Sequence, residues 1–114
     1  MLIYTQDGAI LNFDRYDIIT FELSWNNDIA HIGLFAVRES EKVLLGQYFE
    51  DFTDKEMEIF MEAKNKVEWF HESEEPKVRN AMYAVEIRAS DKAKKLIAKM
   101  VFALSQEGYC EMPK

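Results

Sequence analysis

The sequence of residues 90–108 is SDKAKKLIAKMVFALSQEG, which holds the clearest helical periodicity in the chain. Its apolar side chains recur every three or four positions, a spacing that places them on one face of an α-helix. Ser90 is a favoured N-cap residue, and Gly108 suits the left-handed conformation that often follows a helix. We therefore predict a helix over 90–108 that packs on a sheet. The residues of its apolar face are Ala93, Leu96, Ile97, Met100, Val101 and Leu104.

A second helix is predicted near the middle of the chain. Thr53 and Glu56 have the spacing of a capping box, in which each side chain accepts a hydrogen bond from the backbone amide of the other residue. The hydrophobic period also changes from two to about 3.6 at this point. We therefore predict a helix over 54–71. Its apolar side comprises Met57, Phe60, Met61, Ala63 and Val67.

The first half of the chain shows the two-residue alternation of apolar and polar side chains that is typical of β-strands, and consecutive strands there predict a meander. Asp7 and Gly8 form the pair that supplies the positive φ angles of a tight hairpin turn. Gly33 and Gly46 lie inside predicted strands, where glycine marks a bulge or a bend. The predicted strands are residues 2–5, 9–13, 17–25, 29–37, 43–49 and 82–88, the last with Tyr83, Val85 and Ile87 directed inward.

These elements predict an α+β fold. We expect a curved antiparallel sheet or partial barrel of about six strands with two helices, the C-terminal one packed on the sheet. Residues 29–37 are apolar on both faces, so this strand is expected at the centre. The 114 residues are predicted to form one domain, 1–114, because two halves of that length would each be too short to enclose a core.

Two short stretches resemble small uncharacterised proteins of Gram-positive bacteria and of their phages and plasmids. These stretches are Ile10-Leu11-Asn12-Phe13-Asp14 and Leu44-Leu45-Gly46-Gln47-Tyr48, with a helix afterwards. The resemblance covers about a third of the chain, and residues 50–75 look like an insertion relative to it. It implies a curved antiparallel sheet packed by a C-terminal helix, and no known activity.

The acidic charge of the protein is concentrated in one segment. The formal net charge is −7, and residues 50–75 hold ten acidic side chains against three lysines. The charged residues of 88–99, by contrast, are basic except for Asp91. An acidic total disfavours nonspecific binding to nucleic acid or to an anionic membrane, because such binding depends on Lys and Arg. Cys110 is the single cysteine, and the sequence predicts neither a signal peptide nor a membrane span. We therefore expect a cytoplasmic protein.

No residue pattern in the sequence predicts a catalytic, cofactor-binding or metal site. His31 is a candidate general base, but a structural role within its strand is the preferred interpretation. Cys110 is interpreted as a structural thiol rather than a nucleophile. Glu68 and His71 have the Glu-x-x-His spacing of one ligand pair of a di-iron site, which needs that motif twice and two further carboxylates. We expect no cofactor.

The leading hypothesis is a non-enzymatic interaction or accessory module, which binds another protein or forms a homodimer through charged helix faces. On the predicted helices, Phe102 lies opposite the apolar stripe among lysines, and Trp69 lies among carboxylates. The alternative for these faces is that the two helices lie side by side within one chain and neutralise each other. The predicted interaction surface comprises Asp54, Glu58, Glu62, Trp69, Lys95, Lys99 and Phe102.

Two other functions stay open at this point. A small enzyme or ligand-binding barrel would use a pocket assembled from distant residues such as His31, Tyr48 and Tyr83. Mimicry of nucleic acid would use the carboxylates of the 54–71 helix, whose i, i+4 spacing suits a basic groove on another protein.

Overall fold

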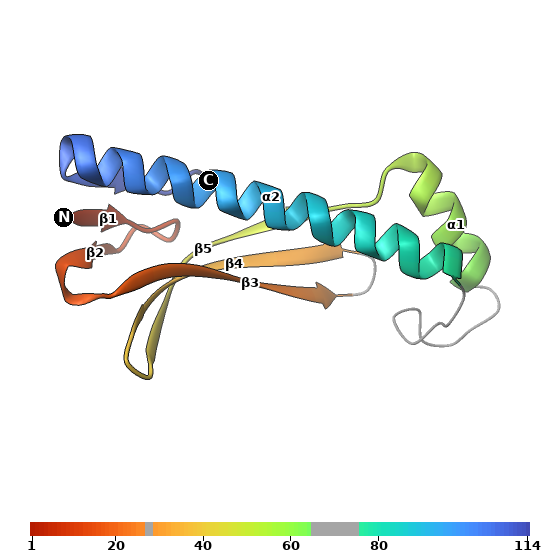
Figure 1. Ribbon diagram of the computed structural model, residues 1–114, viewed down its shortest axis with the longest axis horizontal. Coiled ribbons are helices and arrows are strands. Elements are labelled where there is room, and N and C mark those ends of the chain that lie inside the picture. The colour runs from red at the N-terminus through yellow and green to blue at the C-terminus, as the bar shows by residue number, and fades with distance from the viewer. Residues whose placement is uncertain (27–28, 65–75) are drawn as a thin grey trace.

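The computed structural model describes residues 1–26, 29–64 and 76–114, and these form an α+β protein (Figure 1). The described residues contain six strands in two three-stranded sheets, and five of the six lie where strands were predicted. Two α-helices accompany them, and the C-terminal helix packs on the sheets. The molecule is elongated, with extents of 51 × 27 × 21 Å.

The larger sheet is an antiparallel meander of β3 (Ile18–Asn26), β4 (Ile29–Arg38) and β5 (Glu41–Glu50). β4 lies in the centre, as its apolar sequence predicts. Alternate side chains of β4 are buried on the inner face and half-buried on the outer face. The inner face is therefore the one that meets the rest of the protein.

A β-bulge bends β5 beside Gly46, where the sequence predicts a bulge or a bend. Leu34 pairs with Gly46 and Phe35 pairs with Leu44, which leaves Leu45 as the extra residue. The bulge turns the side chain of Leu45 into the core, where it is 1% exposed. An inserted residue of this kind increases the local twist of the sheet.

The smaller sheet joins the two ends of the described chain. β1 (Leu2–Tyr4) pairs antiparallel with β2 (Ile10–Asn12) through a turn in which Gly8 has a φ of 92°. β6 (Tyr109–Glu111) pairs with the other side of β1, and that pairing is parallel. The sequence does not predict β6, because three residues are too few to show a period.

Helix α1 (Asp54–Lys64) begins at the predicted capping box. The Thr53 amide donates to Glu56 Oε1 at 2.9 Å, and the Glu56 amide donates to Thr53 Oγ1 at 3.3 Å. The remainder of the predicted helix, residues 65–71, lies outside the described residues.

Helix α2 (Pro76–Glu107) is longer than predicted, and the predicted strand over 82–88 is wrong. Residues 82–88 are helical, and only Val85 of its three inward residues is buried. Val78, Ala81, Val85 and Ala89 recur at helical spacing and continue the apolar stripe of the next segment. No described helix combines the length and the apolar character that crossing a membrane requires.

The predicted end of α2 is confirmed. Gly108 follows the helix with a φ of 79°, and its amide donates to the Leu104 carbonyl at 3.1 Å. Only glycine adopts this left-handed conformation without a steric penalty from a Cβ atom. The chain therefore reverses into β6 directly after the helix.

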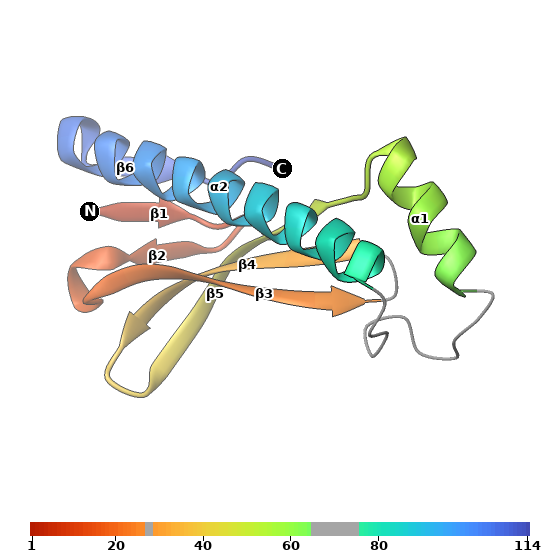
Figure 2. The same cartoon turned by 45° about the vertical axis from the view of Figure 1, so that its right-hand side comes forward.

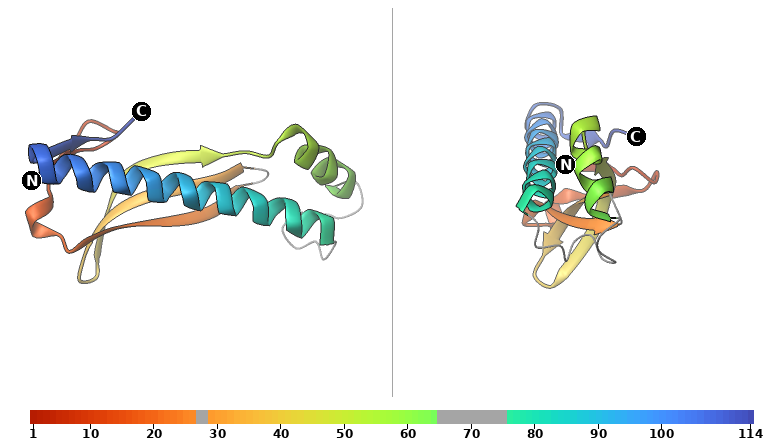
Figure 3. Two further views of the ribbon diagram at one scale, coloured as in Figure 1. Left: turned by 45° about the horizontal axis from the view of Figure 1, so that its top comes forward. Right: turned by 90° about the vertical axis from the view of Figure 1, so that its right-hand side faces the viewer.

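Two clusters of buried side chains lie along α2, one at each half. The "sheet core" lies between both sheets and the C-terminal half of α2, and the "end core" lies between α1, the N-terminal half of α2 and the adjacent ends of β3 and β4. Figures 2 and 3 show α2 along the length of the molecule, with α1 beside its N-terminal end. The sheet core includes Ile3, Ile32, Leu34, Leu45, Ala93, Met100, Leu104 and Cys110, and the end core includes Ala30, Phe52, Phe60, Val78, Ala81 and Val85.

Candidate interaction surface

The solvent side of the C-terminal half of α2 carries an aromatic side chain among lysines. Phe102 is 68% exposed, the highest value among the large apolar residues of the described chain. Lys95 and Lys99 precede it by seven and three residues, so all three lie on one face of the helix. We call these three residues the "Phe102 face". The solvent exposure predicted for Phe102 is confirmed.

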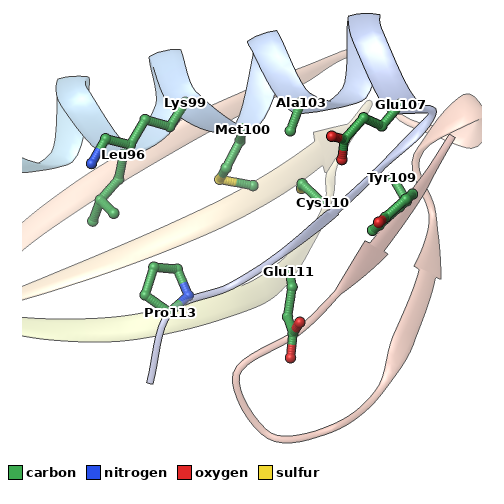
Figure 4. A pocket seen from close by; sticks show the side chains of 9 residues that line it. All are labelled: Leu96, Lys99, Met100, Ala103, Glu107, Tyr109, Cys110, Glu111 and Pro113. Carbon is green, nitrogen blue, oxygen red and sulfur yellow. The ribbon is translucent and has the colours of Figure 1, made fainter.

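An apolar groove borders the Phe102 face (Figure 4). Its volume is about 320 Å³, and Leu96 and Met100 point from α2 towards the C-terminal segment that carries Cys110 and Pro113. Lys99 belongs to both the groove rim and the Phe102 face. The groove is therefore an apolar hollow next to an exposed aromatic ring and a cation. Its remaining lining residues are Ala103, Glu107, Tyr109 and Glu111.

Helix α1 presents an acidic ridge. Asp54, Glu58 and Glu62 are exposed and follow one another at i, i+4 spacing. None of the three forms an ion pair with another residue of the described chain. Trp69, which was predicted to lie on this side, is outside the described residues.

Among the described residues, Arg88 of α2 makes the charge contact with α1. Its guanidinium donates to both carboxylate oxygens of Glu56, at 3.0 and 2.7 Å, and lies 3.6 Å from Glu50. This contact with Arg88 lowers the pKa of Glu56 to about 2, and the same pairing raises the pKa of Arg88. Lys95 and Lys99 form no ion pair within the described residues. Mutual neutralisation of the predicted faces is therefore not what joins the helices.

The three residues of the alternative pocket do not converge. His31 lies on the outer face of the larger sheet, with its ring 4.8 Å from that of Phe49 in an edge-to-face contact. Tyr48 is on the inner face, and its hydroxyl donates to the Pro113 carbonyl at 2.7 Å. Tyr83 is on α2 and is 63% exposed. The structure thus places these side chains on three separate surfaces.

Cys110 lies in β6 and is 5% exposed within the sheet core. Burial raises the pKa of its thiol, so the protonated form predominates at neutral pH. No three His, Cys, Asp or Glu residues of the described chain gather closely enough to hold a metal ion. Glu68 and His71, the residues of the predicted Glu-x-x-His motif, lie outside the described residues.

No protein family model, no curated protein and no solved structure matches this chain.

One exposed apolar flank of α2 was missed by the sequence analysis. Tyr83 and Ile87 were placed inward on a predicted strand, but they are exposed on the helix. The signal was present in the sequence, since extending the helical period of residues 90–108 upstream places both residues on the same side as Val101.

Proposed function

We propose that this protein is a non-enzymatic interaction module that binds another protein through the Phe102 face and the adjacent groove. The observation that carries the proposal is the continuity of Phe102, Lys99 and an apolar groove of about 320 Å³. Exposed aromatic residues beside an apolar hollow and a charged rim are the composition of interface centres. A cytoplasmic setting, in which Cys110 stays reduced, belongs to the same proposal.

The chemistry of this surface defines the partner. An apolar or aromatic side chain of the partner fits the groove formed by Leu96, Met100 and Ala103. Carboxylates of the partner pair with Lys95 and Lys99, which have no ionic partner within the described chain. The expected partner is therefore an acidic protein with an exposed apolar residue, and complementary charge raises the association rate more than the affinity.

Affinity capture with matched baits tests the proposal. The wild-type protein, Phe102→Glu and the double variant Lys95→Glu/Lys99→Glu are immobilised, and bound proteins are compared at moderate and high salt. We expect a partner that both variants lose and that salt weakens. Arg79→Glu, a charge reversal at an exposed position near the other end of α2, is the control and should retain the partner. A partner retained equally by all baits would contradict the proposal.

Mimicry of nucleic acid by the acidic ridge is a second candidate. It is favoured by the exposure of Asp54, Glu58 and Glu62 and by their lack of ion pairs within the described chain. A basic, nucleic-acid-binding partner would then be captured by wild type and lost by the triple variant with Asn and Gln at these positions. Competition by double-stranded DNA for that partner is the distinguishing measurement, because DNA should not displace a partner of the Phe102 face.

A further inference from the structure

The two edges of the larger sheet differ in how they are covered. At β5, the Leu45 carbonyl accepts the Gln6 amide at 2.9 Å. Further along the same strand, the Phe49 carbonyl accepts Lys92 Nζ at 2.9 Å. At β3, by contrast, no described strand pairs with the outer side. β3 spans nine residues without proline or lysine, and its one charged side chain is Glu22, so it lacks the usual protection of an edge strand.

An apolar flank of α2 lies beside the free edge of β3. Tyr83, Ile87 and Val101 are 63%, 44% and 51% exposed. At 100° per residue, these three side chains fall within about 40° of one another around the helix. A groove of about 340 Å³ separates the flank from Leu23 of β3 and is lined by Tyr83 and Ile87. We call the β3 edge and this flank the "edge surface".

The edge surface has complementary charges at its midpoint. Asp91 and Lys94 line the same groove, and both are exposed. Neither forms an ion pair within the described chain. They lie midway between Tyr83 and Val101 along the helix. A two-fold axis between them therefore places each Asp91 beside Lys94 of a second copy, and each Tyr83 beside Val101 of that copy.

The same axis also fits the strand. β3 and α2 run in opposite directions (Figure 1), and Leu23 lies beside the part of α2 between Tyr83 and Lys94. Because a strand rises about 3.3 Å and a helix about 1.5 Å per residue, two residues back along β3 correspond to about four residues forward along α2. Phe21 therefore lies level with residues of α2 within 87–98, the stretch that includes Asp91 and Lys94.

A strand pair centred on Phe21 also avoids a charge clash. In an antiparallel pair of two β3 strands with this centre, Glu22 lies opposite Thr20 of the second copy. A centre one residue later would place the two Glu22 carboxylates opposite each other, which is destabilising. A single two-fold axis is therefore compatible with pairing of the two β3 strands, with contact between the apolar flanks and with the Asp91–Lys94 charge pairs.

We propose that two copies of this chain associate through the edge surface, with their β3 strands antiparallel and their α2 flanks in contact. The two larger sheets then become one continuous six-stranded sheet. This self-association goes beyond the proposed function, because its occupant is a second copy of the chain and it uses the edge surface, which lies next to the Phe102 face on α2. A dimer of this kind is isologous, so each residue pair across the axis occurs twice.

Charge exchange across the axis is the central test. Light scattering of the wild-type chain at high micromolar concentration should give twice the monomer mass of 13.4 kDa. Asp91→Lys and Lys94→Asp should each raise the dimer dissociation constant by about tenfold, because each places like charges opposite each other twice. Mixing the two variants should restore a heterodimer, since every introduced charge then faces an opposite one. Failure of the mixture to regain affinity would overturn the proposed axis.

Further variants distinguish this proposal from the proposed function. Ile87→Glu should dissociate the dimer with an unchanged circular dichroism spectrum, and Ile87→Ser provides a milder second variant. Glu58→Lys, a charge reversal at an exposed position on α1, is the control and should leave the dimer intact. Amide hydrogen exchange of β3 should slow as the concentration of the protein rises. A wild-type monomer at high micromolar concentration, or a dimer that only Phe102→Glu dissociates, would refute the edge surface and leave binding through the Phe102 face standing.

Discussion

The two halves of α2 meet different parts of the protein. The C-terminal half supplies Ala93, Met100 and Leu104 to the sheet core, which both sheets enclose. The N-terminal half supplies Val78 and Val85 to the smaller end core, which is closed by α1. The stability of one continuous helix therefore depends on two unequal sets of contacts. The difference means that a substitution in either half should report on its own core.

The largest expected effect is in the sheet core. Met100 is 4% exposed, so removing its side chain leaves a cavity. Met100→Ala should therefore lower the free energy of unfolding by about 2–4 kcal/mol. Leu96 is only half-buried, so Leu96→Ala should cost less. Denaturant unfolding of both variants measures the difference. Equal losses would show that the two positions are packed alike.

A smaller loss is expected in the end core. Val85 is 0% exposed, and Val85→Ala removes both of its methyl groups from the core. This substitution should lower the free energy of unfolding by about 1.5–2.5 kcal/mol. Hydrogen exchange should increase in α1 and in the first turns of α2 more than around Met100. A uniform increase throughout α2 would show that the two cores unfold as one unit.

The contact between Arg88 and Glu56 gives the end core a pH dependence. The pKa of Glu56 is about 2, below its ordinary value of 4.5, so ionised Glu56 stabilises the folded state at pH values above 4.5. That stabilisation is lost as the pH falls from 4.5 towards 2. Glu56→Gln should lower the free energy of unfolding by about 1–2 kcal/mol at neutral pH. The stability of this variant should also fall less than that of the wild type as the pH is lowered. Thermal melts of both proteins across this pH range provide the measurement, and parallel pH profiles would contradict it.

The smallest effect on stability is expected on the solvent side of α2. Val101 was predicted to belong to the buried stripe, but it is 51% exposed. Val101→Ser and Phe102→Glu should each change the unfolding free energy of the monomer by less than about 0.5 kcal/mol. Urea titrations at low protein concentration test this expectation. A loss comparable to that of Met100→Ala would mean that these side chains are buried in solution.

The halves of α2 also differ in how well their sequence predicts them. Residues 90–107 show helical spacing alone, so their helix and its end at Gly108 were predicted. In residues 82–88 the exposed Tyr83 and Ile87 create an alternation that resembles a strand, and Ser90 imitates an N-cap inside a continuous helix. Residues 82–88 taken alone do not separate a strand from a helix. The longer helical spacing of Val78, Ala81, Val85 and Ala89, which continues the apolar stripe of the next segment, does separate them.

The candidate surface was also only partly predictable from the sequence. The exposure of Phe102 follows from the helical period, because its position opposite the apolar stripe is a local property. The groove beside it depends on Cys110, which the pairing of β6 with β1 positions, and on Pro113, whose carbonyl accepts the hydroxyl of Tyr48. No spacing within the sequence specifies that pairing.

The parallel pairing of β1 with β6 has a consequence for the order of folding. Leu2 pairs with Tyr109, so this contact closes a loop that contains nearly the whole chain, whereas only two residues of sequence separate β3 from β4 and β4 from β5. Closing a long loop costs more chain entropy before any contact compensates for it. The larger sheet should therefore form early and the smaller sheet last. In folding kinetics, the ratio of the change in activation free energy to the change in stability (the kinetic φ value) should be near zero for substitutions in β6 and higher for substitutions in β4. High φ values in β6 would reverse that order.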